Sequence, residues 1–332
     1  MASIGVVGAG IMGLSAAVAI QQRLPAAHVT IMAESFTVDT TSDGAGGLFV
    51  PNAPDTDVSL IRKWGKEGAR HFFNLAFSED SSEAGVYLSH GYELSTKPLE
   101  QLPIELEFAL SHRRLNPEEL KRFQPYYKDG FHFTTVIVEG RKYLPWITAR
   151  FREKGGHMEN RRVQSFDELC GRFDVVVNCS GLGSIKLVPD PLLKPLRGQV
   201  IRVHAPWIKF FVRTDNNVYI LPSSENVAIG STKEADECDV TPNPDVSKQL
   251  FERALARVRA IKGAKTLWEW VGLRPYRCPP RVESEIRRTA DGRPIKIVHN
   301  YGHGSFGISL SWGTGVHVAQ MVSDLLHASP KL

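Results

Sequence analysis

Two short apolar segments near the start of the chain flank a segment rich in alanine. Ile4–Val7 is followed by Gly8-Ala-Gly10-Ile-Met-Gly13, then by the alanine-rich Leu14–Gln22 and by the second apolar segment, His28–Met32. Short continuous apolar runs are typical of buried parallel strands, and a crossover helix joins two such strands in a βαβ unit. The pattern therefore predicts a strand, a helix and a strand, with the glycines at the first turn.

An apolar strand followed by a glycine-rich turn recurs near the middle and near the end of the chain. Phe173–Asn178 leads into Cys179-Ser-Gly-Leu-Gly-Ser184, and a last strand over Ile295–His299 precedes the loop Gly302–Gly307. We expect a closing helix from about Gly315 to His327, because its apolar residues fall on one face.

The segments between these elements have the pattern of antiparallel strands, as in Phe210–Val212, Val218–Leu221 and Val227–Gly230. This order predicts an α/β protein in which a discontinuous, Rossmann-like nucleotide-binding domain holds an inserted antiparallel-sheet domain for the substrate. We assign residues 1–50, 140–190 and 285–332 to the nucleotide-binding domain, and mainly residues 51–139 and 191–284 to the substrate domain.

Composition narrows the class of protein. The 332 residues are enough for about two domains, and 23% charged with 42% hydrophobic residues excludes a disordered or fibrous chain. The net charge of +4 is small and scattered, so we expect no nucleic-acid partner. The four cysteines lie far apart, which predicts neither a disulfide framework nor a zinc site and favours a reducing compartment.

Two further features have a simpler explanation than the one they first suggest. Ile4–Ile20 carries no charge, but it contains four glycines in 17 residues and no basic segment precedes it, so we expect no membrane span. His299 and His303 are four residues apart, but Gly302 and Gly304 argue against a helix that would present both to a metal ion. We therefore expect no metal site.

The first glycine turn has the spacing of a dinucleotide-binding loop. Gly8 permits the tight turn, Gly10 lets a phosphate approach the backbone, and Gly13 lets helix and strand pack closely. Backbone N–H groups at the helix start would bind a pyrophosphate. Glu34 follows Gly10 by 24 residues, close to the spacing of the acid that binds a ribose. Both NAD and FAD satisfy this pattern.

The loop at the other end of the chain favours FAD. Gly302–Gly307 opens a second helix, whose positive end would stabilise the negative charge of a reduced flavin ring. An NAD-dependent dehydrogenase would use only the first unit and leave this loop unexplained. A glycine turn that binds no ligand also stays open at this stage.

Motifs along nearly the whole chain resemble the D-amino-acid oxidase family of FAD flavoproteins. The last of them resembles the family's signature most closely, although that signature ends in alanine where this chain has Gly315. The motifs are Val7-Gly-Ala-Gly-Ile-Met-Gly-Leu-Ser15, Phe36-Thr-Val-Asp-Thr-Thr-Ser-Asp43, Tyr143-Leu-Pro-Trp146, Val177-Asn-Cys-Ser-Gly181, Arg197-Gly-Gln199, Gly272-Leu-Arg-Pro275 and Val298-His-Asn-Tyr-Gly-His-Gly304.

The resemblance implies a set of FAD-binding residues. Those for the pyrophosphate are Gly8, Gly10, Ile11 and Met12, and those for the adenosine ribose are Glu34, where the family usually has aspartate, and Ser35. The path of the phosphates and the flavin would be lined by Thr40, Thr41, Ser42, Gly47 and Leu48, with Val163 and Ser180 near the adenosine and ribityl portions. The residues facing the flavin ring would be Gly304, Ser305, Gly307, Ile308 and Ser309.

The resemblance also implies the reaction. A hydride passes from the substrate Cα to the flavin, the imino acid hydrolyses to a 2-oxo acid and ammonia, and O2 reoxidises the flavin to give H2O2. Arg274 matches the arginine that binds the α-carboxylate, and Tyr219 matches the tyrosine that caps the substrate. A protein that holds flavin without turnover is the alternative from another class.

Two cations suggest acidic D-amino acids, with D-aspartate first. Arg213 matches an arginine near the side-chain carboxylate of such substrates, and Lys233 stands where those enzymes carry another arginine. Ser305 would add a hydroxyl contact. The segment between Arg213 and Tyr219 is short, unlike the longer lid of enzymes for neutral D-amino acids, which remain the alternative.

The chain ends in Ser329-Pro-Lys-Leu332, and its last three residues resemble the S-K-L address with proline in place of serine. This predicts the peroxisomal import receptor as a partner and the peroxisomal matrix as the location, with the cytoplasm as the alternative. A homo-oligomer stays open.

Overall fold

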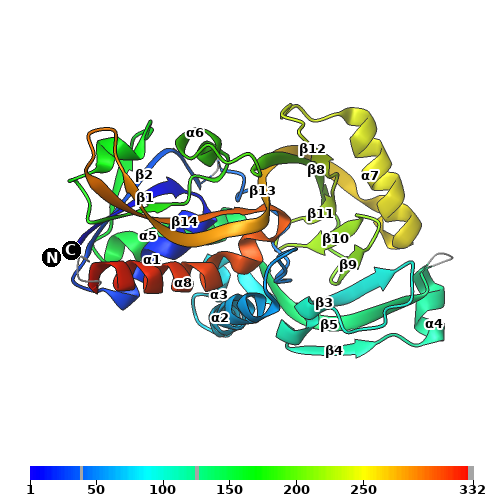
Figure 1. The fold of residues 1–332 in the computed structure, drawn as a ribbon. Coiled ribbons are helices and arrows are strands. Elements are labelled where there is room, and N and C mark those ends of the chain that lie inside the picture. Colours follow the sequence, from blue (N-terminus) through cyan, green and yellow to red (C-terminus); the bar gives the residue numbers. More distant parts are fainter. Residues whose placement is uncertain (38–39, 124–126, 328–332) are drawn as a thin grey trace.

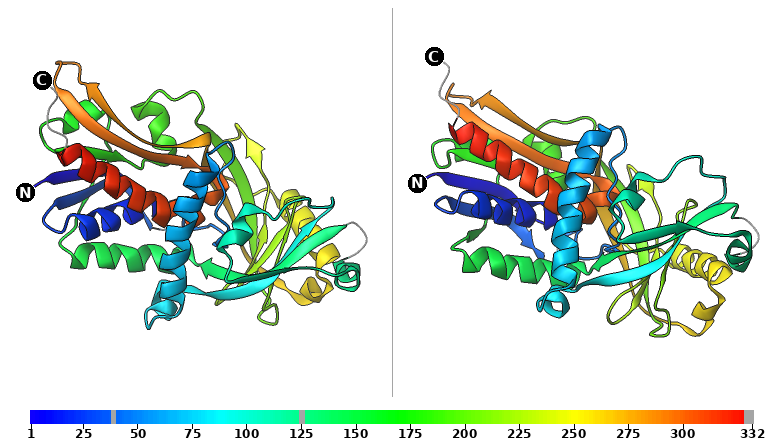
Figure 2. Two further views of the ribbon diagram at one scale, coloured as in Figure 1. Left: turned by 60° about the horizontal axis from the view of Figure 1, so that its bottom comes forward. Right: turned by 90° about the horizontal axis from the view of Figure 1, so that it is seen from below.

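The computed structural model describes residues 1–37, 40–123 and 127–327. Within them, 14 strands form one mixed sheet that runs through the whole molecule (Figure 1). Helices α1, α2, α5 and α8 lie on the half of the sheet that contains the N-terminus, while α7 packs on the other half, beside β8 and β11 (Figures 1 and 2). The predicted α/β fold class is confirmed.

One half of the sheet consists of parallel strands. The first of them pairs with a neighbour on each side, in the order β6-β2-β1-β7-β14. These strands are β1 (Ser3–Ala9), β2 (His28–Phe36), β6 (His157–Asn160), β7 (Val175–Asn178) and β14 (Pro294–His303). This is the βαβ arrangement that the apolar segments predict, completed by the middle and last strands.

The other half is mainly antiparallel, and only β3 and β9 pair in parallel there. Its strands are β3 (Val86–Ser95), β4 (Ser111–Arg114), β5 (Asp129–Val138), β8 (Lys194–His204), β9 (Phe211–Thr214), β10 (Tyr219–Pro222), β11 (Val227–Gly230), β12 (Glu234–Ala235) and β13 (Lys265–Arg288). Because one sheet runs through both halves, the boundaries between the two domains stay a prediction.

The helices differ in how completely they are buried. In α1, ten of the 13 residues are buried, which explains its small side chains. The helices are α1 (Ile11–Arg23), α2 (Val58–Ala76), α3 (Ser81–Ala84), α4 (Pro117–Leu120), α5 (Gly140–Glu153), α6 (Ser184–Leu187), α7 (Pro244–Arg257) and α8 (Gly307–His327). Short 3-10 turns are η2 (Ile104–Phe108), η3 (Lys121–Phe123), η4 (Phe166–Leu169), η5 (Gly181–Gly183), η6 (Arg259–Gly263) and η7 (Gly304–Phe306).

The closing helix is longer than the sequence predicts, because it begins at Gly307 rather than near Gly315. Its glycines serve packing rather than a loop. A Cβ on Gly313 would lie 2.1 Å from the carbonyl oxygen of Trp64 in α2, and one on Gly315 would lie 3.0 Å from the backbone of Ser15 in α1. Close approach of α8 to α2 and α1 requires glycine at these two positions.

Two predicted features lie outside the described residues, in whole or in part. The C-terminal Ser329-Pro-Lys-Leu332 lies wholly outside, and Val38 and Asp39 of the motif Phe36–Asp43 also do. Of the helices in the described ranges, none has the length and apolarity that crossing a membrane requires.

Gly313→Ala tests the contact between α2 and α8. Alanine gains about 1 kcal/mol over glycine inside a helix, but overpacking a backbone contact of 2.1 Å should cost more, so we expect the free energy of unfolding to fall by about 1–3 kcal/mol. Thermal unfolding of the purified protein measures this change. Gly315→Ala, with its looser contact, is the matched control and should lower the melting temperature less. A Gly313→Ala protein as stable as wild type would contradict this account.

Candidate active site

A cavity of about 730 Å³ opens at the carboxyl ends of the parallel strands and continues beneath the antiparallel strands. In parallel sheets, ligands bind at this edge. Every residue predicted above to bind the cofactor or the substrate lies along the wall of this one cavity. The structure thus brings the two predicted sets together, while the role of each residue stays a prediction.

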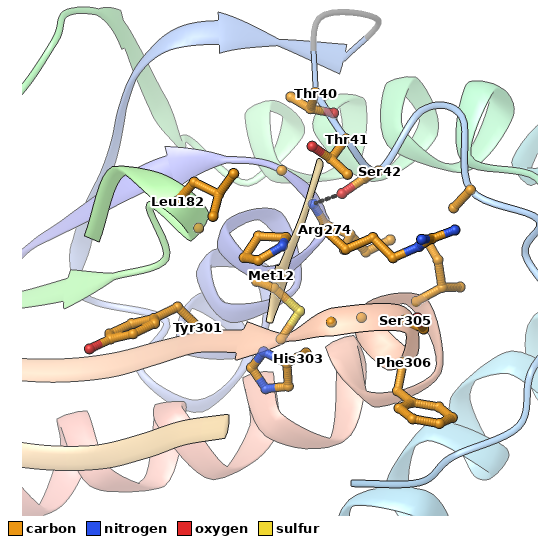
Figure 3. Close-up of a pocket in the computed structure, with 18 of the residues that line it drawn as sticks. Met12, Thr40, Thr41, Ser42, Leu182, Arg274, Tyr301, His303, Ser305 and Phe306 are labelled. Atoms are coloured by element: carbon orange, nitrogen blue, oxygen red, sulfur yellow. Dashed lines mark hydrogen bonds between the residues drawn. The ribbon is translucent and has the colours of Figure 1, made fainter. Parts of the chain in front are cut away.

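The start of α1 forms one end of the cavity. Gly10 precedes the helix, no side chain caps it, and its first turn has no acidic residue. The Ser42 hydroxyl accepts a hydrogen bond from the Ile11 N–H at 3.2 Å (Figure 3). A Cβ on Gly10 would meet only that hydroxyl, at 3.5 Å, so the backbone here is open to a ligand. An open helix N-terminus of this kind binds phosphate groups.

The other two glycines of the loop are fixed by packing. Gly8 has φ +109°, and a Cβ there would lie 2.4 Å from the carbonyl oxygen of Cys179. A Cβ on Gly13 would lie 1.9 Å from the carbonyl oxygen of Gly8. Both positions therefore require glycine for the turn and for the contact between β1, α1 and β7.

The end of β2 contributes a polar wall next to this helix start. Glu34 lines the cavity, and its carboxylate lies 3.4 Å from the Arg162 guanidinium, which also lines it. Ser35 and Val163 stand on either side. An exposed carboxylate near the end of the second strand suits the hydroxyls of a ribose. Sequence analysis missed Arg162, since nothing in its spacing marks it.

The segment after β2 forms the middle of the wall. The Thr41 hydroxyl donates to the carbonyl oxygen of Leu273 at 3.1 Å, which ties this segment to β13. Gly47 has φ +81°, and a Cβ there would lie 2.2 Å from the Val138 carbonyl oxygen. Across the cavity, the Ser180 hydroxyl donates to Asn178 Oδ1 at 2.7 Å. Thr40 and Leu48 complete this part of the lining.

The start of α8 forms the opposite side. β14 ends at His303, η7 follows, and the lining residues Gly304, Ser305, Gly307, Ile308 and Ser309 come from η7 and the first turn of α8. The Ser309 hydroxyl accepts from the Val50 N–H at 2.9 Å and donates to the Leu48 carbonyl oxygen at 3.2 Å. Ser309 therefore holds the cavity wall together, whereas the Ser305 side chain is exposed.

His303 provides a test of whether a large polar ligand fits here. It lines the cavity and is buried, yet within the described part of the chain neither of its ring nitrogens has a hydrogen-bond partner. Burial lowers the pKa of His303 to about 3, so the ring is neutral. Unpaired buried polar atoms are costly, which indicates that a bound cofactor supplies their partners.

Sequence analysis considered His303 only as a metal ligand and so missed this position. The described residues contain no group of three or more histidine, cysteine, aspartate or glutamate side chains that could hold a metal ion. The signal that could have found His303 was present, since it lies in the motif that begins at Val298 and Gly304 follows it directly.

Arg274 places a guanidinium in the cavity wall. It donates to the Thr232 carbonyl oxygen at 3.2 Å and to the Ser231 hydroxyl at 3.0 Å. A Cβ on Gly198 would lie 2.0 Å from its Nη1, so the glycine on β8 makes room for it. Burial lowers the pKa of Arg274. Among the described side chains, no carboxylate pairs with it, and in Figure 3 it lies between Ser42 and Ser305.

Arg213 stands in a row of side chains that crosses four strands. In the register of the sheet, Glu93 of β3 lies opposite Arg213 of β9, which lies opposite Tyr219 of β10, and Tyr219 faces Gly230 of β11. Directly opposed residues share one face of a sheet. The ring of Tyr219 covers Gly230, where a Cβ would lie 2.5 Å from the tyrosine oxygen.

Arg213 is not free, contrary to what its predicted role suggests. Its Nη1 lies 3.2 Å from Glu93 Oε2 and 3.2 Å from Glu105 Oε1. Lys233, by contrast, has no ion-pair or hydrogen-bond partner among the side chains that the structure describes. Burial and the charges of Arg274 and Arg213 lower the pKa of Lys233. Sequence analysis found both cations and missed both carboxylates.

Comparison with known proteins agrees with this geometry. The model of the family described as DAO, FAD dependent oxidoreductase, matches residues 3–321. The chain is 41% identical over 330 residues to D-aspartate oxidase of Homo sapiens, which covers 98% of this chain and 96% of that protein. It is 37% identical over 328 residues to D-amino acid oxidase of Dugesia ryukyuensis, with 97% and 98% covered.

Solved structures share the fold. Glycine oxidase from Geobacillus kaustophilus has a TM-score of 0.76 at 20% identity, over 98% of this chain and 95% of that one. Reduced L-alpha-glycerophosphate oxidase from Mycoplasma pneumoniae with FAD bound has a TM-score of 0.72 at 14% identity, over 99% and 96%. FAD is therefore the cofactor of this cavity, and the chain belongs to the D-amino-acid oxidase family of FAD dependent oxidoreductases.

Proposed function

We propose that this protein oxidatively deaminates acidic D-amino acids, D-aspartate first, to a 2-oxo acid, ammonia and H2O2, with O2 as the second substrate. The observation that carries the proposal is the half-buried Arg274 guanidinium, which lines the cavity with no carboxylate partner among the described side chains. Two further cations, Arg213 and Lys233, line the same cavity. Relatives named as D-aspartate oxidases and D-amino-acid oxidases support the same substrate class.

Arg274 and Tyr219 would hold the amino-acid end of the substrate. A guanidinium binds a carboxylate with two parallel hydrogen bonds, which fixes the plane of the carboxylate as well as its position. The contacts to Thr232 and Ser231 orient the Arg274 fork before the substrate arrives. Tyr219, on strand β10, would cover the bound substrate and exclude water.

The bound FAD supplies the chemistry, since its flavin accepts the hydride of the substrate Cα and is reoxidised by O2. The residues of the chain contribute position and charge. The start of α8, with Gly304, Gly307 and Ile308, would lie against the ring, where the positive end of the helix stabilises the negative charge of the reduced state. No side-chain nucleophile is required for this step.

The preference for acidic substrates rests on charge. A second carboxylate that enters a mostly dry cavity costs several kcal/mol unless a cation meets it. Lys233 and Arg213 would meet it, with Ser305 as a hydroxyl donor. A neutral D-amino acid is the second candidate, because one of the similar proteins is named D-amino acid oxidase without reference to an acidic substrate.

A panel of D-amino acids, followed by peroxide release, tests the proposed function. We expect D-aspartate to give the highest kcat/KM, D-glutamate to follow, and D-alanine and D-methionine to be poor. The L-enantiomers are the control and should give no peroxide. A preference for D-alanine or D-methionine would favour the second candidate, and flavin binding without turnover on any amino acid would overturn both.

Lys233→Met tests the charge that selects acidic substrates. Loss of a charge-assisted contact should lower kcat/KM for D-aspartate about 10- to 100-fold, while kcat/KM for D-alanine should stay the same or rise. Lys233 suits this test because it supports no ion pair in the described structure, unlike Arg213, whose removal leaves Glu93 facing Glu105. Arg213→Leu should change the two substrates as Lys233→Met does, lowering kcat/KM for D-aspartate and leaving kcat/KM for D-alanine the same or higher. An equal loss with both substrates would contradict acidic selectivity.

We also propose that the protein enters the peroxisomal matrix through an import receptor that binds Pro330-Lys-Leu332. The release of H2O2 by the reaction makes that compartment chemically suitable. A fluorescent protein that ends in these residues should form peroxisomal spots, and a Leu332→Asp version should be diffuse. Diffuse fluorescence of both would place the protein in the cytoplasm.

A further inference from the structure

The substrate end of the cavity holds more carboxylates than a site for an acidic ligand needs. Arg213 is bracketed by Glu93 from β3 and Glu105 from η2, each 3.2 Å from the same nitrogen. Both carboxylates are largely withdrawn from water, with side chains 15% and 7% exposed, and Glu93 lines the cavity itself. The arginine that should receive the substrate's side chain is thus already neutralised.

The other charged groups nearby do not compensate for this excess of negative charge. Asp215, after β9, also lines the cavity, and its carboxylate accepts hydrogen bonds from the Thr96 N–H at 2.7 Å and the Thr96 hydroxyl at 2.8 Å. Glu105 accepts one further bond, from the Asn52 amide at 3.4 Å. Among the described residues that line this end, Lys233 is the remaining cation, because Arg274 would serve the α-carboxylate. Three carboxylates therefore face two cations before any substrate binds.

We propose that Glu93 and Glu105 form a charge-balancing pair behind Arg213, and that an acidic substrate binds together with a proton held by Glu93. The inference rests on the proposed function. The side-chain carboxylate of D-aspartate would be a fourth anion beside two cations. Protonation of Glu93 removes one negative charge and releases Arg213 to the substrate, while Glu105 keeps the guanidinium in place. Glu93 is thus a positioning residue that acts through Arg213.

Among these carboxylates, Glu93 is suited to hold the proton. The pKa of Glu93 is raised to about 7, because the increase from burial, supported by the charges of Glu105 and Asp215, outweighs the decrease from Arg213. A substrate carboxylate that pairs with Arg213 would weaken the effect by which Arg213 lowers the pKa of Glu93. It would also repel the Glu93 carboxylate, so the pKa of Glu93 would rise further. Binding of the acidic substrate and of the proton then support each other.

The consequence is a pH dependence that only acidic ligands show. Above pH 7 the protonated fraction of Glu93 falls, so KM for D-aspartate should rise by up to about tenfold per pH unit, and below pH 7 it should level off. D-Alanine brings no second carboxylate, so it provides a reference for all groups that the two substrates share. We therefore expect the ratio of kcat/KM, D-aspartate over D-alanine, to fall between pH 7 and 8.5.

Glu93→Gln is the decisive variant. It keeps the shape and the hydrogen-bonding oxygen but carries no charge, so the ratio should become independent of pH and exceed the wild-type ratio at pH 8.5. Glu105→Gln should also weaken the dependence, because it removes one anion. Glu107→Gln is the matched control on the same 3-10 turn, since Glu107 pairs with Arg62 at the surface, 2.8 Å away. It should leave the wild-type profile unchanged.

A second measurement separates binding from turnover. Malonate, a dicarboxylate that cannot be oxidised at Cα in this way, should perturb the flavin absorbance of the holoenzyme when it binds. We expect its Kd to rise with pH above 7 in wild type and to stay constant in Glu93→Gln, whereas acetate should show no such difference between the two proteins. Lys233, whose pKa burial also lowers, is tested separately: if its charge caused the dependence, Lys233→Met would remove it and Glu93→Gln would not.

The outcomes distinguish this inference from the proposed function. If wild type releases no peroxide from D-aspartate at any pH, the proposed function fails. If D-aspartate is oxidised but the ratio is independent of pH, or if Glu93→Gln keeps the wild-type pH profile, the charge-balancing role of Glu93 is wrong while the function stands.

Discussion

The arrangement of the active site depends on the backbone pairing of a single strand, β13. Its first half pairs with β8 from Lys265 to Tyr276, and its second half pairs with β14 from Arg281 to Arg288. β14 leads into the helix start beside the flavin site, and β13 itself carries Arg274. Because one strand joins both halves of the sheet, Arg274, the proposed ligand of the substrate carboxylate, keeps a fixed position relative to the start of α8. Hydride transfer requires such fixed geometry between two reacting atoms.

The two ends of the cavity use backbone and side chains differently. At the cofactor end, the helix starts at Ile11 and Gly307 offer N–H groups, and glycines bring the backbone close. At the substrate end, guanidinium, ammonium and carboxylate groups line the wall. This division follows from the ligands. Phosphates and a reduced flavin are stabilised by the constant positive potential of backbone N–H groups at a helix start. Discrimination among amino acids instead needs charged side chains at one defined distance from Cα.

The sequence predicted four of the five parallel strands, all but β6, together with α1 and the glycine turns, because each depends on contacts close in sequence or on a short motif. It placed the start of α8 eight residues late, because the first turns of this helix pack against residues far away in the sequence, such as Trp64 in α2. The sequence did not predict the roles of Glu93 and Glu105 for a related reason. They lie more than 100 residues before Arg213, and only the pairing of β3 with β9 and the position of η2 bring them to it.

The carboxylates beside Arg213 affect which anions this site binds as well as how tightly it binds them. A bare arginine would attract any anion of suitable size, including small carboxylates that carry no amino group. With Glu93 and Glu105 beside it, Arg213 offers its full charge only to a ligand that displaces a carboxylate already in place. Such a ligand must gain enough elsewhere to offset that displacement. Arg274, which we propose binds the α-carboxylate and which has no carboxylate partner among the described side chains, is the group that would supply this gain. Selectivity for a dicarboxylic amino acid therefore rests on two cations. Arg274 has no carboxylate partner among the described side chains, and the charge of Arg213 is balanced by Glu93 and Glu105.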